Sequence, residues 1–370
     1  MRWSALAGLG LGLFLAVALA GCGNTSSTGG PSSSEGSIPS AERKLLPVKT
    51  DGVKADLAGK IQIDGSSTVY KISQLAAEEF SSKAPNVEIS VGYVGTGGGF
   101  KSFPDPAKKL DVCDASRPIQ RNELDACVKN GVKFLELPIG IDAITIVVST
   151  KNDFLKEITL AELQKLWAPG DGGTGNVRKW NEVRSDWPDQ PVALYGADSA
   201  SGTFEYFNEA VHHDKKKTRS DYTANANDNI LIQGVEKNKF ALGYIPYAYY
   251  VPRTKSLRAV KVKVKEGEAA ALPNPQTISS GGYHPFARPL FIYVNLQSLE
   301  RPAVANFVQF YIDNAAALSN NAGYIAFDAA IYAKVRERLD KRELGTAFGG
   351  TLKEDMNLTT IMDLPVKAQQ

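Results

Sequence analysis

Three short polar segments contain the residues best suited to hold an anion. They are Asp64-Gly-Ser-Ser-Thr-Val69, Gly95-Thr-Gly-Gly-Gly99 and Asp198-Ser-Ala-Ser-Gly-Thr203. The first and third stand directly before helical patterns, where hydroxyl groups and unpaired backbone N–H groups gather at the positive end of the helix dipole. The glycines of the second permit positive φ and a close approach of ligand to backbone, and Thr96 adds a hydroxyl. Together the segments predict a cradle for an anion.

Each segment also has a structural interpretation, because a Ser- or Gly-rich turn before a helix is often only an N-cap with its loop. That alternative stays open for any one turn. Three such turns at the ends of strands are harder to explain as caps alone, so we expect them to form one site.

The elements that must position these turns alternate between strand and helix from Lys60 onward. The apolar patterns predict strands at 61–63, 87–91, 132–137, 141–148, 192–195, 240–245 and 289–294, and helices at 72–80, 122–130, 159–167, 230–238, 304–312, 329–339 and after Thr203. This alternation is typical of α/β architecture with parallel strands. The sequence has no internal repeat of fixed period, which argues against a solenoid or a propeller.

The first residues have the features of an export signal. Arg2 precedes an uncharged apolar stretch, Leu6–Ala20, which is shorter than the roughly 20 residues needed to span a bilayer. Leu19-Ala-Gly-Cys22 resembles the bacterial lipobox. We therefore expect residues 1–21 to be a lipoprotein signal peptide and Cys22 to be lipidated. A buried N-terminal helix is the structural alternative.

A flexible tether is predicted to follow, over residues 22–56, because residues 23–40 are almost wholly Gly, Ser, Thr, Pro and Asn. The protein would then lie in the periplasm or on the outer face of the cell membrane, held there by its N-terminal lipid.

The composition limits the classes of function. The chain has 370 residues, of which 43% are hydrophobic and 22% charged, so it can form a core and is not a disordered protein. Lys and Arg number 42 against 40 Asp and Glu, which disfavours nucleic acid as a partner. Three Cys and three His are too few for a zinc cluster or an iron–sulfur scaffold, and we expect neither a metal nor a cofactor.

Cys113 and Cys127 are predicted to form a disulfide. Outside the cytoplasm nearby thiols tend to pair, and closing this loop would stabilise the fold by roughly 3 kcal/mol if the geometry is unstrained. Two buried free thiols are the alternative.

Several motifs resemble those of bacterial periplasmic phosphate-binding proteins, the PstS-type substrate-binding lipoproteins of phosphate ABC transporters. The resemblance covers the chain from about Lys60 to Leu339. It rests on Asp64-Gly-Ser-Ser-Thr-Val-Tyr70, Asp114-Ala-Ser-Arg-Pro-Ile119, Ser201-Gly-Thr-Phe-Glu-Tyr-Phe207, Phe240-Ala-Leu-Gly-Tyr244 and Asn321-Ala-Gly-Tyr324.

The resemblance implies a two-lobed, clamshell-like α/β fold that holds its ligand in the cleft between the lobes. Two crossover strands would form the hinge, and 141–149 and 289–295 are the candidates. Lobe I would then be discontinuous, with residues 57–145 and 286–370, and lobe II would contain residues 146–285.

The resemblance also implies ligand-binding residues. Ser67, Thr68 and Val69 would meet phosphate at the first turn, Thr96 at the second, and Ser201, Gly202 and Thr203 at the third. The chain departs from the family at two positions: Arg117 replaces an aspartate, and Ala197 or a neighbour replaces an arginine before the third turn. A guanidinium from either lobe can bind two phosphate oxygens, so we expect Arg117 to supply the cation. A surface arginine before a proline is the alternative.

A carboxylate is expected to accept the proton of phosphate, since phosphate near neutral pH can donate a hydrogen bond and sulfate cannot. With Arg117 at the family's aspartate position, Asp64, Asp142 and Asp198 are the candidates for this acceptor.

The predicted function is high-affinity binding of inorganic phosphate outside the cytoplasm by a monomer, which delivers it to the permease subunits of an ABC transporter. Alternatives within the same fold are a binding protein for another tetrahedral oxyanion and a phosphate sensor. An exported phosphoester hydrolase is a third, but the chain has no Gly-x-Ser-x-Gly motif, and His212-His213-Asp214 reads as a solvated loop. We therefore predict a binding protein and not an enzyme.

Overall fold

The computed structural model describes residues 45–199, 201–214, 216–225, 227–349 and 358–367. The predicted signal peptide, the lipidated Cys22 and most of the predicted tether lie outside this range. Among the described residues, no helix is both long enough and apolar enough to cross a membrane.

The first part of the fold, which we call lobe I, begins as repeated βα units. Its elements are β1 (Gly59–Gly65), α1 (Ser67–Ser81), β2 (Val87–Val91), α2 (Thr96–Ser102), β3 (Val112–Ala115), α3 (Arg121–Lys129) and the first half of β4 (Phe134–Ser149), joined later by β11 (Ala287–Asn295), α9 (Pro302–Asp313), α10 (Ala315–Ala322) and α11 (Ala329–Asp340). Helix α1 buries Val69, Ile72, Ala76 and Phe80, which recur at helical spacing and so lie on one face.

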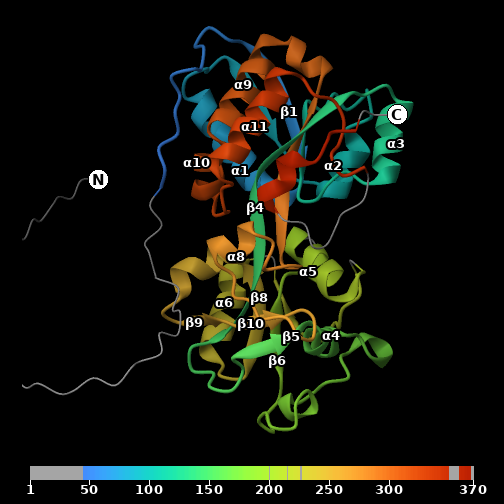
Figure 1. The fold of residues 1–370 in the computed structure, drawn as a ribbon, viewed down its shortest axis with the longest axis vertical. Coiled ribbons are helices and arrows are strands. Elements are labelled where there is room, and N and C mark those ends of the chain that lie inside the picture. Colours follow the sequence, from blue (N-terminus) through green and yellow to red (C-terminus); the bar gives the residue numbers. More distant parts are fainter. Residues whose placement is uncertain (1–44, 200, 215, 226, 350–357, 368–370) are drawn as a thin grey trace, which may run out of the picture. The chain divides into compact units, whose positions relative to one another are not determined.

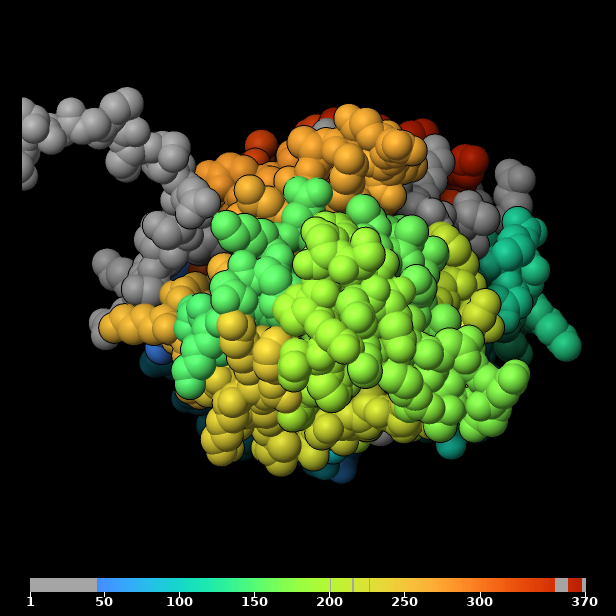
Figure 2. Space-filling view, turned by 90° about the horizontal axis from the view of Figure 1, so that it is seen from below, coloured from blue at the N-terminus to red at the C-terminus, as the bar shows by residue number. Residues whose placement is uncertain are grey.

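The second part, lobe II, is inserted between β4 and β11. Its elements are β5 (Glu157–Thr159), α4 (Leu160–Trp167), β6 (Ala193–Gly196), α5 (Gly202–His212), β7 (Thr223–Ala224), α6 (Asp228–Lys237), β8 (Ala241–Pro246), α7 (Tyr247–Tyr250), β9 (Leu257–Ala259), β10 (Lys261–Lys263) and α8 (Pro275–Ser279). This part of the chain, green to orange, forms the end of the molecule seen in Figure 2.

Strand β4 connects the two lobes, as Figure 1 shows. Its residues 134–143 pair with β11 of lobe I, and its residues 144–149 pair with β8 and β9 of lobe II. The sheet path within the described residues is β2-β1-β3-β11-β4-β8-β6-β7. Every residue of β4 is buried, which agrees with its unbroken apolar pattern.

Two details of the predicted elements are wrong. The strands predicted at 132–137 and 141–148 are one strand, β4, because the chain passes straight from one sheet into the other. The sheet is also mixed and not parallel, since β11 runs antiparallel to both β3 and β4. A chain that leaves lobe I on one strand and returns to it on an adjacent strand must run in opposite directions on the two.

The predicted disulfide is absent from the structure: Cys113 on β3 and Cys127 on α3 are both free and buried. Burial raises the pKa of the Cys113 thiol well above its ordinary value and that of Cys127 to about 12. Both groups therefore stay neutral thiols, which are the unreactive form. The alternative of two buried free thiols is the one that the structure shows.

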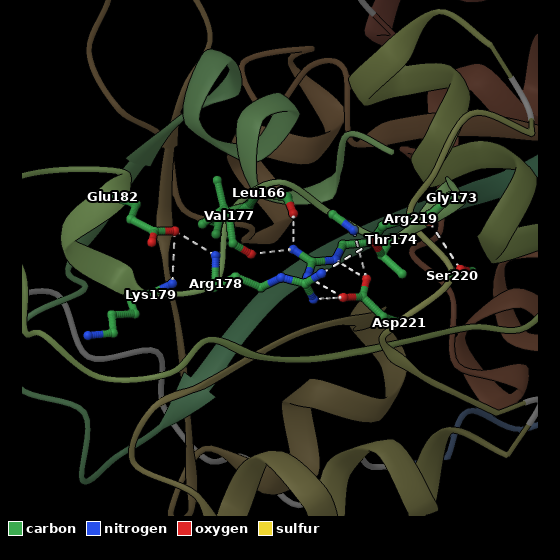
Figure 3. A network of polar contacts seen from close by, with 11 residues as sticks. Leu166, Gly173, Thr174, Val177, Arg178, Lys179, Glu182, Arg219, Ser220 and Asp221 are labelled. Atoms are coloured by element: carbon green, nitrogen blue, oxygen red, sulfur yellow. Dashed lines mark hydrogen bonds and ion pairs between the residues drawn. The ribbon is translucent and has the colours of Figure 1, made fainter. Parts of the chain in front are cut away.

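A buried arginine holds the long loop of lobe II that follows α4. Arg219, 4% exposed, donates to both carboxylate oxygens of Asp221 at 2.6 and 2.8 Å and to the carbonyl oxygens of Leu166 and Val177 at 2.9 and 3.0 Å. Figure 3 shows this network, in which the exposed Arg178 reaches the same carboxylate. The loop is thus fixed by charge-assisted hydrogen bonds where it has no regular secondary structure.

Candidate functional site

The three polar turns meet at one cavity of about 500 Å³. Ser66 and Ser67 come from the start of α1, residues 95–98 from the start of α2, and Ser199, Ser201 and Gly202 from the start of α5. The remaining lining residues are Tyr93, Val94, Ser116, Arg117, Glu205, Tyr206, Glu209 and Arg288. Both lobes therefore contribute to the wall of the cavity.

The first turn is fixed by the hydroxyl of Ser66, the N-cap of α1. This oxygen accepts from the N–H groups of Thr68 and Val69 at 3.2 and 3.4 Å. Gly65, at φ +138°, allows the turn to pass β3, since a Cβ here would stand 2.2 Å from the carbonyl oxygen of Asp114. The turn leaves Ser67 on the cavity wall, while Val69 is fully buried in the core.

The second turn is the start of a helix and not only a glycine loop. Gly95, at φ +82°, is the N-cap of α2 and supplies no side chain, so the N–H groups of the first turn of the helix have no capping oxygen of their own. The hydroxyl of Thr96 lies 3.0 Å from that of Ser116 and accepts from its N–H at 3.2 Å. This pair fixes Thr96 at the edge of the cavity.

The third turn brings lobe II against lobe I. Ser201 caps α5 and accepts from the N–H of Thr203 at 3.2 Å. The N–H of Gly202 donates to the hydroxyl of Ser67 at 3.4 Å, which joins the start of α5 to the start of α1. Two helix N-termini from different lobes thus converge at one point, and their dipoles favour negative charge there.

Arg117 lines the cavity but is already paired. Its Nη1 and Nη2 donate to the two carboxylate oxygens of Glu123 at 2.8 and 2.6 Å, and both side chains are 10% exposed. Burial opposes its charge, but the hydrogen bonds and charge of Glu123 outweigh burial and raise the pKa of Arg117. The guanidinium is therefore a fixed cation in the wall of lobe I.

A second arginine lines the same cavity from the crossover strand β11. Arg288, 7% exposed, donates through Nε and Nη2 to Asp142 Oδ2 at 3.2 and 3.0 Å and through Nη2 to Thr68 Oγ1 at 3.2 Å. Its guanidinium carbon lies 4.0 Å from the centre of the Tyr206 ring of α5. Asp142 stands directly opposite Arg288 in the ladder of β4 and β11.

A larger groove, of about 1110 Å³, lies at the opposite ends of the lobe I strands. Of the cations that line it, Lys60 and Arg301 are paired with Glu88 and Asp111, and its lining belongs to lobe I alone. It lacks the converging helix starts of the smaller cavity, so the smaller cavity is the candidate site.

Comparison with known proteins identifies the family. A family model described as a PBP superfamily domain matches residues 50–315. Protein SphX of Synechocystis sp. is 41% identical over 82% of this chain and 88% of that protein. The phosphate-binding protein PstS of Staphylococcus haemolyticus is 33% identical over 77% of this chain and 87% of its own. The chain belongs to the PBP superfamily and to the family of PstS-type phosphate-binding proteins.

A solved structure of a PstS-type relative has the same fold. A possible phosphate binding protein from Planctomyces limnophilus is 44% identical, with a TM-score of 0.69, and covers 78% of this chain and 100% of its own. The two-lobed α/β fold expected from the sequence is therefore confirmed. The relatives of this PstS-type chain are binding proteins and not enzymes, which removes the support for a hydrolase.

The structure brings together only part of the predicted phosphate-binding residues. Ser67, Thr96, Arg117, Ser201 and Gly202 line the cavity. Thr68, Val69 and Thr203 lie behind the wall, with exposed fractions of 8%, 0% and 8%. Arg288 was not identified from the sequence. This part of the chain was regarded only as a crossover strand, and the cation that binds phosphate was expected at Arg117.

The carboxylates nominated as proton acceptors do not line the cavity. Asp64 Oδ1 accepts from the N–H groups of Gly65 and Val94 at 2.8 and 3.1 Å, so this carboxylate fixes the first and second turns. Asp142 is paired with Arg288, and Asp198 is the first residue of the third turn. The carboxylates that line the cavity are Glu205 and Glu209, both on α5 of lobe II.

Proposed function

We propose that this protein binds inorganic phosphate outside the cytoplasm and delivers it to the permease of an ABC transporter. The observation that carries this function is the convergence of two helix N-termini, α1 of lobe I and α5 of lobe II, between two buried arginines. Such a site offers donors and positive charge to an anion that has several acceptor oxygens. The relatives named phosphate-binding proteins indicate which anion it is.

In this proposal the anion is bound by groups from every wall of the cavity. Ser67, Thr96 and Ser201 offer hydroxyls, and Arg117 offers a charge that Glu123 holds in place. Thr68, Val69, Gly202 and Thr203 contribute through the dipoles of the two helix starts, since their N–H groups donate to Ser66, Ser67 and Ser201. Because these donors are preorganised, little of the binding free energy is spent on ordering them.

The proposal for the lobes follows the strand pairing. Residues 57–145 and 286–370 would form lobe I and residues 146–285 lobe II, and the partner strand of β4 changes between residues 143 and 144. Binding to one lobe and closure of the second would then be a population shift about β4 and β11. The closed monomer would dock on the permease.

The proposal for the location rests on the sequence. Cleavage after residue 21, lipidation of Cys22 and a tether up to residue 56 would hold the protein at the outer face of a membrane, near its permease. Mass spectrometry of the exported protein tests this, with a diacylated N-terminal cysteine as the expected result. Cys22→Ser should abolish the diacylation, and an exported protein whose N-terminal peptide carries no lipid would contradict the anchor.

The experiment for phosphate binding is isothermal titration of the purified chain, freed of co-purified anion, with phosphate alone and with excess sulfate. We expect one phosphate per chain and no competition by sulfate. Arg117→Ala should weaken binding strongly, and Lys239→Ala, a partly exposed cation of lobe II that does not line the cavity, is the control. Sulfate or arsenate binding in place of phosphate would assign another oxyanion, and the absence of any anion binding would refute the function.

A further inference from the structure

Arg288 occupies a position that no other residue of the cavity shares, because it lies on the hinge and contacts both lobes. It belongs to β11, one of the two strands that join the lobes. Asp142, its partner in the ladder, belongs to β4, the other joining strand. The ladder changes partner one pair further on, since Ala143 still pairs with Ala287 of β11 and Ile144 pairs with β8. The guanidinium therefore stands at the point about which the lobes turn.

Arg288 contacts each lobe through a different kind of interaction. Toward lobe I, Nη2 donates to the hydroxyl of Thr68 at 3.2 Å, at the start of α1. Toward lobe II, the flat guanidinium lies 4.0 Å from the centre of the Tyr206 ring, a cation–π contact with α5. Both α1 and α5 begin at the anion cavity, so the same side chain touches the two helices whose starts converge there.

Tyr206 is held so that it can keep this contact. The ring is 6% exposed, and its hydroxyl donates to the carbonyl oxygen of Pro285 at 2.7 Å, three residues before Arg288. Asp142 fixes the other side of the guanidinium through two hydrogen bonds to one oxygen. Asp142 thus orients the arginine from the hinge, and Tyr206 contacts it where lobe II meets the hinge.

We propose that Arg288 is the residue that couples anion binding to closure of the two lobes. This inference rests on the proposed function and adds a mechanism to it. An anion in the cavity attracts the guanidinium and the start of α1 together. Because Tyr206 is stacked on the guanidinium, α5 is favoured in the position that completes the cavity. The ligand then shifts the population toward the closed form through a contact that exists only when the lobes meet.

The proposal predicts that affinity and closure can be separated by substitution. Arg288→Lys keeps the charge but loses the flat face that stacks on Tyr206 and the fork that spans Asp142 and Thr68. Tyr206→Leu removes the ring and leaves the cation. Tyr206→Phe, the matched control, keeps the ring and removes only the hydroxyl bond to Pro285.

Closure is measured as the distance between spin labels on cysteines introduced at Lys83 and Lys237, which are exposed on lobe I and lobe II. Of the three native cysteines, Cys113 and Cys127 are buried and should not react with the label, and Cys22 is replaced by serine in these variants. The full chain is titrated with inorganic phosphate, and affinity is measured on the same samples by isothermal titration. Thermal unfolding without ligand reports any general loss of structure.

The expected results differ between the variants. In the unsubstituted chain and in Tyr206→Phe, saturating phosphate should give one short distance. In Arg288→Lys and Tyr206→Leu, phosphate should bind about tenfold or more weakly, as for the loss of one charge-assisted contact. At saturating phosphate, both variants should keep the distribution of distances between the spin labels that the ligand-free protein has.

Two outcomes would overturn the proposal. If Arg288→Lys and Tyr206→Leu close at saturating phosphate as the unsubstituted chain does, Arg288 is only a structural or binding residue and the phosphate function stands. If the unsubstituted chain binds no phosphate, the function itself fails and the coupling fails with it.

Discussion

At the scale of single residues, Gly202 is one of the points where the two lobes touch. A Cβ added there would lie 3.2 Å from the hydroxyl oxygens of both Ser67 and Thr68. Gly202→Ala should therefore hold the lobes apart and weaken phosphate binding about tenfold, as judged by isothermal titration. The stability of the ligand-free chain should stay equal or rise slightly, because alanine is the better helix former by about 1 kcal/mol.

The control for this prediction is Gly52→Ala, since a Cβ at Gly52 meets nothing within 4 Å. It should change neither affinity nor stability. If Gly202→Ala bound phosphate as tightly as Gly52→Ala, the contact between the two helix starts would have no part in binding.

His212 gives a prediction about acid stability. The residue ends α5, and burial lowers its pKa to about 4 from the ordinary 6.5, with a smaller contribution from Lys217. The folded chain then binds fewer protons at this site than the unfolded chain between these two pH values, so stability falls as the pH drops from about 6.5 to about 4. His212→Gln should lose less stability over this range, as measured by urea unfolding at several pH values.

The control for His212 is its neighbour His213, which is exposed and has φ +56°. His213→Asn suits this left-handed backbone conformation and should retain the acid sensitivity of the unsubstituted chain. Equal pH profiles for the unsubstituted chain and His212→Gln would show that burial of this imidazole does not govern acid stability.

The residues of the site were only partly accessible to sequence reasoning. Ser67, Thr96 and Ser201 could be predicted, because N-caps and glycine turns are local features of the chain. Arg288 and Glu205 could not, because their place in the cavity depends on how β11 and α5 pack in three dimensions. The two cysteines were misjudged for a similar reason: proximity in the sequence does not determine whether two thiols meet.

At the scale of elements, Arg219 determines whether the loop after α4 keeps its structure. Arg219→Gln should lower the free energy of unfolding by about 3 kcal/mol, because it breaks the ion pair between the buried guanidinium and the partly exposed Asp221 and leaves two buried carbonyl oxygens without their donor. Urea unfolding followed by tryptophan fluorescence measures this loss. Arg178→Gln, which removes a 58% exposed partner of the same Asp221, should cost less than about 1 kcal/mol.

The same network predicts a pH dependence. The hydrogen bonds from Arg219 lower the pKa of Asp221 below its ordinary value of 3.8. Because the pKa of Asp221 is lower in the folded chain than in the unfolded chain, the carboxylate stabilises the folded chain at pH values above the pKa of the unfolded chain. This contribution is lost as the pH falls below about 4. The stability difference between the unsubstituted chain and Arg219→Gln should therefore shrink in acid. A difference that is constant down to pH 2 would contradict this assignment.

The elements themselves were predicted best where their pattern is local. Helix α4 could be located from its capping box, in which Thr159 Oγ1 accepts from the N–H of Glu162. Strand β4 could not be seen as one element, since Pro138 and Gly140 interrupt a pattern that is continuous only because both sheets bury it. Helix α2 begins with Thr96 followed by three glycines, and propensity alone places no helix there.

At the scale of the whole molecule, the two lobes also meet outside the anion cavity. Lys71 of α1 donates to the hydroxyl of Tyr249 of α7 at 3.0 Å, and its ammonium lies 4.6 Å from the centre of the same ring. The contact joins lobe I to lobe II without lining the cavity. It should therefore stabilise the closed protein with no effect on the ligand contacts themselves.

This separation leads to a kinetic prediction. If the lobes close on phosphate as proposed, Lys71 and Tyr249 are apart in the open protein that phosphate enters and joined in the closed protein that holds it. Removing the pair should leave the association rate constant unchanged and raise the dissociation rate constant. Stopped-flow mixing of phosphate with the full chain, followed by tryptophan fluorescence, measures both constants.

Tyr249→Phe, which keeps the ring, should release phosphate about 2 to 10 times faster, as for one lost hydrogen bond. Tyr249→Leu, which loses the ring as well, should release it faster still. If either substitution slowed association and left dissociation unchanged, Lys71 and Tyr249 would be in contact already in the open protein, and closure would have to be stabilised by the cavity alone.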